Sequence, residues 1–296
     1  MEPLRFTKMH GLGNDYLYID IRDMADQPDS VWSHYAVLMS DRHFGVGADG
    51  IILIARSNVA PVRMRIFNAD GSESEMCGNG LRALAKWLFD RGQFQSGQAV
   101  ETGAGLLYPE IVSQEGGSAR IIRVDMGPPR LTRQDMGMTG QPDAHCLEEP
   151  LDVNGEVYSM TCVSMGNPHV IIFGPLWDED TMAKRGAAIE HHPLFSRRTN
   201  VHSVEVEDYT HLKIRHWERG AGLTLACGTG VAASTVAAVL TQRTARQVTV
   251  SVPGGTLEAL WDEATGHRLC CPRQRQEPRW DRRNALTRLH SRKIAK

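Results

Sequence analysis

The sequence predicts an α+β protein built from two similar domains with largely antiparallel sheets. Short runs of β-branched and aromatic residues recur along the 296 residues and outnumber the helical patterns. A Cys-Gly-polar-Gly motif occurs twice, as CGNG at 77–80 and as CGTG at 227–230, and a Gly-Asn pair ends 63 and 60 residues before the respective cysteines. A motif that recurs in matching surroundings in each half indicates two copies of one structural unit.

The elements can be assigned in chain order. Eight short segments bounded by turn-forming or polar residues predict strands, at 16–21, 50–55, 62–67, 121–126, 161–163, 169–173, 211–216 and 247–252. Three longer segments, 30–42, 81–90 and 231–242, predict helices. Leu81, Leu84 and Leu88 recur at helical spacing in the second, and the third is apolar nearly all round, which predicts deep burial.

The sequence MGPP at 126–129 ends a predicted strand and marks the expected domain boundary. We therefore expect an N-terminal domain at 1–128, a C-terminal domain at 129–271 and a tail at 272–296. The tail holds nine basic and two acidic residues, so its formal charge is +7 and that of the remainder is −9. We expect this Arg-rich tail to be poorly ordered, and because it contains no folded reader motif we expect no nucleic-acid partner.

Composition argues against several other classes of protein. The N-terminal MEPLRFTKMHG has no apolar signal-peptide core, and the longest small or apolar run, 231–240, is too short to span a bilayer. We expect a cytoplasmic protein that is not associated with a membrane. The six cysteines lack the paired spacing of a metal site, so we expect free thiols and no metal.

Each Cys-Gly-polar-Gly motif places a thiol at the N-terminus of a predicted helix. The unpaired N–H groups and the helix macrodipole favour the thiolate there, and such surroundings lower a cysteine pKa from about 8.5 to between roughly 3.5 and 7.5. The glycines let the same N–H groups approach a carboxylate. Two such thiols predict an acid–base pair, in which one sulfur removes a proton next to a carboxylate and the other returns a proton to the opposite face. This inversion requires neither a metal nor pyridoxal phosphate, so we expect no cofactor.

Six segments resemble, in order, the signature blocks of the diaminopimelate epimerase family. They are FTKMHGLGNDYLYID (6–20), FNADGSESEMCGNGLRALAKW (67–87), SMGNPHVIIF (164–173), RRTNVHSVEV (197–206), WERGAGLTLACGTGVAAS (217–234) and VPGGTLEALW (252–261). The resemblance spans roughly residues 5–265. It implies two pseudo-symmetric domains, each a mostly antiparallel, barrel-like sheet around a central helix. It also implies a homodimer that interconverts LL- and meso-diaminopimelate without a cofactor, on the route to lysine and peptidoglycan.

The resemblance makes Cys77 and Cys227 the two catalytic residues. It places the substrate against the backbone of Gly78, Asn79, Gly228 and Thr229 and the side chains of Asn14, Asn68, Asn167, Asn200, Glu218 and Arg219. The chemistry agrees, because a guanidinium suits a carboxylate, a carboxylate suits an ammonium group, and an amide both donates and accepts. His169 follows Gly-Asn-Pro and lies near the site in the family, so it either tunes a thiol or is a structural histidine.

Two features depart from the family pattern. The block before the second cysteine usually reads Gly-Glu-Thr, but here Leu223 replaces the glutamate, so a carboxylate is missing. After Leu269 the segment CCPRQRQ replaces the pattern of the family's last strand, which predicts a sheet without its closing strand and with an exposed edge. These two departures leave two interpretations open, a fully active enzyme and an impaired one.

Several alternatives remain at this point. Another superfamily isomerase, similar to a proline racemase or a methylitaconate isomerase, would use the same two thiols, although Glu218 and Arg219 favour a substrate with two polar ends. An amino-acid-binding homologue with impaired catalysis fits Leu223 and the altered tail. A dithiol redox protein is a further alternative, but the two cysteines of such a protein are normally adjacent in sequence, and those at 77 and 227 are not. The glycine patterns at 45–50 and 228–233 lack either the strand-to-helix order or the acidic residue of a dinucleotide site.

Overall fold

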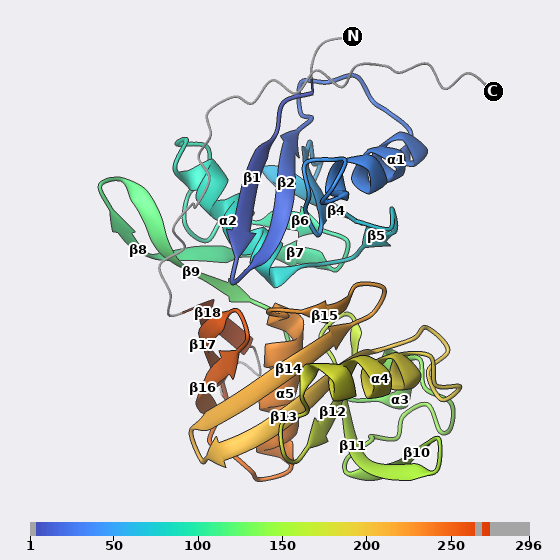
Figure 1. Cartoon of the computed structure of the whole chain (residues 1–296). Helices are drawn as coiled ribbons and strands as arrows, with labels where there is room; N and C mark the ends of the chain where they lie inside the picture. Colours follow the sequence, from blue (N-terminus) through green and yellow to red (C-terminus); the bar gives the residue numbers. More distant parts are fainter. Residues whose placement is uncertain (1–3, 264–267, 273–296) are drawn as a thin grey trace, which may run out of the picture.

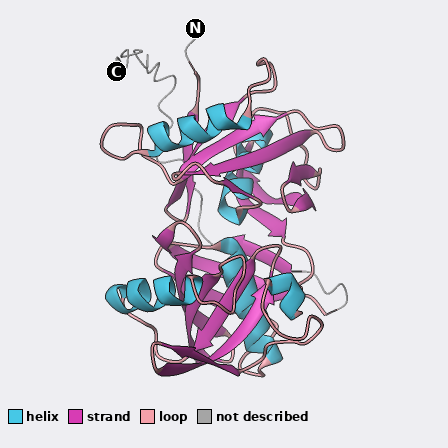
Figure 2. Cartoon of the chain, turned by 90° about the vertical axis from the view of Figure 1, so that its right-hand side faces the viewer, coloured by secondary structure: helices cyan, strands magenta, loops and turns pink. Residues whose placement is uncertain are grey.

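The computed structural model describes residues 4–263 and 268–272. These residues form two α+β bodies, one stacked on the other (Figure 1), each a mainly antiparallel sheet with few helices. Figure 2 shows the same stack from the side, with helices flanking the strands of both bodies. The predicted fold class is confirmed. Residues 273–296 of the predicted tail lie outside the described part of the chain.

The N-terminal body is organised around a seven-stranded sheet with one helix on each face. Its strands are β1 (Thr7–Gly11), β2 (Asn14–Asp20), β3 (Gly50–Ala55), β4 (Val62–Asn68), β5 (Glu73–Ser74), β6 (Val100–Thr102) and β7 (Gly105–Leu107). Helix α1 (Asp29–Ser40) buries Trp32 against Leu17 and Leu53 on one face. Helix α2 (Gly78–Phe89) buries Leu84 in a core with Ile52 on the other.

The C-terminal body repeats this plan within an 11-stranded sheet. Its strands are β8 (Pro109–Glu115), β9 (Ser118–Asp125), β10 (Glu149–Val153), β11 (Glu156–Ser164), β12 (Pro168–Phe173), β13 (Asn200–Asp208), β14 (His211–Glu218), β15 (Gly222–Thr224), β16 (Gln247–Val252), β17 (Gly255–Trp261) and β18 (Arg268–Pro272), and its helices are α3 (Arg133–Met136), α4 (Glu179–Glu190) and α5 (Gly228–Leu240). Helix α4 covers the outer face through Met182 and Ile189. Helix α5 is buried almost all round, as predicted.

Strand register aligns three strands of one body with three strands of the other, residue by residue. In the first, β2 runs parallel to β3 and β3 antiparallel to β4, and in the second β12, β13 and β14 repeat these directions. The pair Tyr16↔Gly50 corresponds to His169↔Asn200. The pair Ile52↔Ile66 corresponds to His202↔His216. This equivalence shows which side chains differ at matching places.

The expected open sheet edge after Leu269 is wrong. Strand β18, which contains Cys270 and Cys271, pairs antiparallel with β17 on one side and with β9 on the other. Strand β9 also contacts α2 of the N-terminal body. Strands β8 and β9 therefore connect the two bodies, while a domain boundary between residues 128 and 129 stays a prediction. Within the described residues, no helix is both long and apolar enough to cross a membrane.

Candidate active site

Both cysteines lie at the N-caps of buried helices. Cys77 precedes α2 and accepts a hydrogen bond from the Gly80 N–H at 3.4 Å, and Cys227 precedes α5 and accepts one from the Gly230 N–H at 3.3 Å. Both have extended backbone, which turns the side chain back onto the first helical turn. Each sulfur therefore takes the place of an ordinary N-cap oxygen, as the two motifs predict.

The two cysteine loops contact each other. A Cβ atom built on Gly228 would lie 3.5 Å from the Cα atom of Gly78 and 3.9 Å from the backbone nitrogen of Asn79. The Asn79 side chain donates to the carbonyl oxygen of Ala226 at 3.0 Å, which links the loop of one body to the loop of the other. The N-termini of α2 and α5, with their unpaired N–H groups, therefore face one shared region.

Burial governs the ionisation of Cys77. The pKa of its thiol is raised to about 11, chiefly by desolvation and in addition by the nearby charge of Glu218. The Gly80 N–H, the Tyr16 hydroxyl and the charge of Arg82 oppose this rise. The thiol also donates to the Asn14 side-chain oxygen, with 3.5 Å between the two atoms.

Cys227 experiences the same balance of effects. Only 4% of the residue is exposed, and desolvation together with Glu218 raises the pKa of its thiol well above the ordinary value. Thr229 Oγ1, at 3.4 Å from the sulfur, and the Gly230 N–H act in the opposite direction. The predicted lowering of the two thiol pKa values is therefore wrong, because desolvation outweighs the helix terminus.

Glu218 is a partly buried carboxyl group whose charge acts on both thiols. Burial raises its pKa, while hydrogen bonds with Thr224 and Cys227 lower it. The Thr224 hydroxyl donates to it at 2.6 Å. A carboxyl group and two thiols in one desolvated region cannot all carry negative charge without strong repulsion.

The remaining predicted residues belong to small hydrogen-bonded groups. Asn14 donates to Asp49 at 2.7 Å, and Asn68 donates to Ser72, in its own turn, at 3.1 Å. Asn167 donates to Thr229 at 3.4 Å and lies 2.9 Å from His169. Asn200 accepts from the Arg219 N–H at 2.9 Å. The structure thus brings most predicted residues beside one of the two sulfurs or beside Arg219, whereas Asn68 contacts neither sulfur.

Arg219 extends from the C-terminal body to the N-terminal body. Its guanidinium donates to the carbonyl oxygen of Arg197 at 3.1 Å and to the Glu75 carboxylate at 3.3 Å. Glu75 lies two residues before Cys77, so this ion pair also connects the two cysteine loops. Because Glu75 is half-exposed, this ion pair contributes little to stability.

Arg82 is a site residue that the sequence did not predict. It is fully buried, and its Nη2 donates to the side-chain oxygen of Asn79. Among the described residues, no hydrogen-bond partner lies near its Nε or Nη1 atoms. Nη1 is 3.6 and 3.8 Å from the Cβ positions of Gly78 and Gly228. A permanent positive charge therefore lies behind both helix termini.

Other contributors were also missed. Tyr16, Glu75 and Thr224 contact Cys77, Arg219 and Glu218, and His202 and His216 continue a chain of hydrogen bonds from His169. Tyr16 could have been found, because it follows Asn14 by two residues just as His169 follows Asn167. His202, His216 and Thr224 depend on strand register, which the sequence does not reveal.

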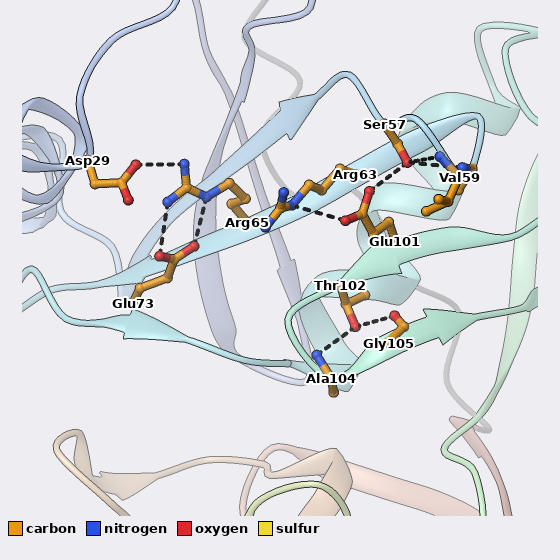
Figure 3. Close-up of polar contacts among 11 residues, drawn as sticks. Asp29, Ser57, Val59, Arg63, Arg65, Glu73, Glu101, Thr102, Ala104 and Gly105 are labelled. Carbon is orange, nitrogen blue, oxygen red and sulfur yellow. Dashed lines mark hydrogen bonds and ion pairs between the residues drawn. The ribbon is translucent and has the colours of Figure 1, made fainter.

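Leu223 lies outside the cluster around the sulfurs. Figure 3 shows Arg65 of the N-terminal body between Glu73 and Asp29. Arg65 donates to Glu73 at 2.7 and 2.9 Å and to Asp29 at 2.8 Å. The register makes Leu223 the counterpart of Glu73 and Arg215 that of Arg65. Arg215 has only Glu179, at 3.8 Å, and its Nε lacks a partner in the described part of the chain. Because Leu223 is 41% exposed, the missing carboxylate is a lost partner of Arg215 and not a lost group of the site.

No group of three or more His, Cys, Asp or Glu side chains within residues 4–263 and 268–272 is arranged to hold a metal ion. The groups placed to perform chemistry are two thiols, one carboxyl group and two guanidinium groups. They supply acid, base and anion-binding functions.

Comparison with known proteins agrees with this geometry. The family model described as diaminopimelate epimerase matches residues 6–132 and 161–270. A diaminopimelate epimerase of Pelotomaculum thermopropionicum is 49% identical over 88% of this chain and 92% of its own length. One of Acetivibrio thermocellus is 46% identical, over 89% and 93%. Among solved structures, a probable proline racemase from Agrobacterium radiobacter shares the fold, with a TM-score of 0.69 and 13% identity over 93% of this chain and 91% of that one.

Proposed function

The chain belongs to the diaminopimelate epimerase family, and on this premise we infer that it interconverts LL- and meso-diaminopimelate by a reaction with two thiols. The observation that carries the mechanism is the meeting of two cysteine-capped helix N-termini at one region. Family membership supplies the substrate, which is a small molecule. The roles of the individual residues are our proposal.

The carboxylate of the reacting centre binds the N–H groups of Gly78, Asn79, Gly228 and Thr229. The charge of Arg82 lies behind these groups. When the α-proton leaves, the electron pair of the Cα–H bond spreads onto this carboxylate. Fixed N–H dipoles in a desolvated site stabilise the added charge without having to reorganise, and one such donor contributes about 3 kcal/mol.

The proton transfers are symmetric. The thiolate of one cysteine takes the α-proton and becomes a thiol, while the thiol of the other cysteine gives its proton to the opposite face and becomes a thiolate. The enzyme therefore ends each turnover with the two protonation states exchanged, and the reverse reaction begins from that state. A sulfur whose pKa is raised by burial is a stronger base once ionised.

The other end of diaminopimelate requires its own recognition. We propose that its carboxylate replaces Glu75 as the partner of Arg219, with Asn200 holding the Arg219 backbone in place. Glu218 accepts a hydrogen bond from a substrate ammonium group, which also offsets the charge of the thiolate. This two-ended site supports diaminopimelate over proline or methylitaconate.

The proposal also includes a cytoplasmic, cofactor-independent homodimer. The cysteines at 77, 146, 162 and 227 are free, as expected in a reducing compartment. The thiols and helix termini provide the acid, the base and the anion site. The homodimer is supported by the family resemblance, and light scattering would test it.

The decisive experiment is epimerisation of LL-diaminopimelate in deuterated water, followed by proton NMR of the product. We expect deuterium at the inverted α-carbon, because the donated proton comes from a thiol that exchanges with solvent. Inversion with full retention of the original hydrogen would reject the two-base scheme. Proline and methylitaconate serve as control substrates, and turnover of either in place of diaminopimelate would reject the assigned substrate.

A further inference from the structure

Three fully buried histidines form a row across the C-terminal sheet. His169 on β12, His202 on β13 and His216 on β14 occupy neighbouring strands. His169 Nδ1 lies 2.8 Å from His202 Nε2, and His202 Nδ1 lies 2.9 Å from His216 Nδ1. The three imidazoles are therefore joined in series by hydrogen bonds.

The row ends at Cys227. His169 Nε2 lies 2.9 Å from Asn167 Oδ1, and Asn167 Nδ2 donates to Thr229 Oγ1 at 3.4 Å. That hydroxyl is in turn 3.4 Å from the sulfur of Cys227. A second contact comes from below, since a Cβ atom on Gly230 would lie 2.4 Å from His202 Cε1. His202 thus fills the space under the glycine whose N–H donates to the same sulfur.

All three imidazoles are neutral. Desolvation lowers the pKa of His169 and of His216 to about 3, and it places the pKa of His202 well below its ordinary value. Electrostatic interactions with His216 and with Arg219 act on the pKa of His169 in the same direction. On the cysteine side, Glu218 is the titratable group that faces Cys227. A neutral imidazole has one donor and one acceptor nitrogen.

With the Asn167 oxygen facing His169, this rule assigns every proton in the row. The Asn167 oxygen can only accept, so His169 carries its proton on Nε2 and accepts at Nδ1. His202 must then donate from Nε2 and accept at Nδ1. His216 must donate from Nδ1, which leaves its Nε2 unprotonated. In agreement, His216 Nε2 is buried and has no hydrogen-bond partner among the described residues.

We propose that His169, His202 and His216 are positioning residues that hold the Asn167 amide in one orientation, so that the Thr229 hydroxyl donates to Cys227. Because Asn167 donates to Thr229 Oγ1, the hydroxyl proton is free to point at the sulfur. A flipped amide would accept that proton instead and remove the donor from the thiolate. The inference rests on the proposed function, because the donor matters only to a sulfur that becomes a thiolate.

The N-terminal body offers an internal reference. Ile52 and Ile66 occupy the places of His202 and His216, and Tyr16 occupies the place of His169. Cys77 therefore receives a hydroxyl hydrogen bond directly from Tyr16, without a row of imidazoles. Replacing His202 by isoleucine gives the second body the side chain that the first already accommodates.

The first test requires no substitution. Heteronuclear NMR of the wild-type chain, with isotope-labelled histidine, identifies the protonated nitrogen of each ring. We expect Nε2–H for His169 and His202 and Nδ1–H for His216. A proton on Nδ1 of His169, or a cationic ring in the row at neutral pH, would overturn the proposal. The result does not depend on whether the chain turns over diaminopimelate.

The second test measures the thiols. Labelled cysteine reports the pKa of Cys227 and of Cys77 in the wild type, in His202→Ile and in His202→Gln, whose amide can still donate to His169. We expect His202→Ile to raise the pKa of Cys227 by about one unit, a tenfold loss of thiolate, with Cys77 unchanged. His202→Gln should restore most of the difference. Equal changes at both cysteines, or an unchanged Cys227 in folded His202→Ile, would show that the row is only structural.

Discussion

The two cysteine loops have the same backbone but different support. Behind Gly80 lies Ile52, whose Cδ1 would be 2.6 Å from an added Cβ, and behind Gly230 lies the ring of His202. In both halves a buried side chain lies against the third residue after the cysteine, where only glycine leaves room. The comparison shows that the space behind this glycine is filled in both loops. The side chain that fills it can be apolar, as in Ile52, or polar, as in His202.

Charge is distributed unequally as well. Arg82 lies two residues after Gly80, whereas Ala232 lies two residues after Gly230. A single buried guanidinium therefore serves the termini of both helices. A second one would add a like charge to the same desolvated region, at a cost of several kcal/mol.

The largest expected effect tests whether the two sulfurs are equivalent. Cys77→Ala and Cys227→Ala should each lower the rate of epimerisation by roughly 10² to 10⁴, because each removes one of two proton-transfer groups. The rate at which meso-diaminopimelate forms from LL-diaminopimelate, followed in a coupled assay, measures this loss. Cys146→Ala is the matched control for loss of a buried thiol. Near-normal turnover by either active-site variant would remove that cysteine from its proposed role.

The next test measures stability at low pH. The imidazole row exists in the C-terminal body only, so the effect of acid on buried histidines belongs to that body. Unfolded histidines bind protons below about pH 6.5, while His169 and His216 stay neutral to about pH 3, so stability is lost as the pH falls through this window. Between pH 6.5 and 5 each contributes a loss of about 2 kcal/mol. Urea unfolding at the two pH values measures it. The His216→Ile variant should lose less on acidification, and an equal loss would contradict the assignment.

Arg82 tests the shared charge. Arg82→Met should lower kcat/KM by about 10- to 100-fold and raise the pKa of Cys77, since a fixed positive charge behind the N–H groups is lost. Arg82→Lys keeps the charge and should recover part of the rate. Unfolding curves for both variants separate this effect from loss of structure. If the two variants lost equal activity while folded, hydrogen-bond geometry and not charge would be the function of Arg82.

The smallest expected effect repairs the missing carboxylate. Leu223→Glu should give Arg215 the partner that Glu73 gives Arg65, and so stabilise the C-terminal body by about 0.5 kcal/mol at low salt. Thermal unfolding measures it, and Leu223→Gln controls for polarity. The rate of epimerisation should stay within about twofold, because side-chain changes at an exposed site away from the sulfurs act weakly. A large gain in rate would show that position 223 reaches the substrate.

Much of the fold could be predicted from local patterns. All eight predicted strands and three predicted helices are present, with shifted ends. The helices at 81–90 and 231–242 begin three residues earlier than predicted, because the cysteine N-caps draw two glycines of poor helix propensity into the first turn. Helix α4 was missed, although Asp178 and the acidic first turn are a readable start signal.

The site was predictable only in part. The cysteines, Arg219 and the asparagines stand in short motifs that resemble those of the family, so they could be proposed from the sequence, and their roles stay predictions. Arg82 resembles any basic residue on a helix until its burial is known, and the histidines at 202 and 216 become neighbours only through the register of β13 and β14. The thiol pKa values were predicted in the wrong direction, because sequence reveals a helix terminus but not the depth of burial.

The meeting of the N-termini of α2 and α5 has a consequence for how the two bodies are held together. The positive ends of two helix dipoles face each other there, and Arg82 adds a charge of the same sign. The N-terminal and C-terminal bodies therefore repel each other at this point. In the proposed mechanism, a substrate carboxylate bound between the two N-termini offsets this repulsion. Binding of the substrate therefore also strengthens the contact between the two bodies, and release of the product weakens that contact again.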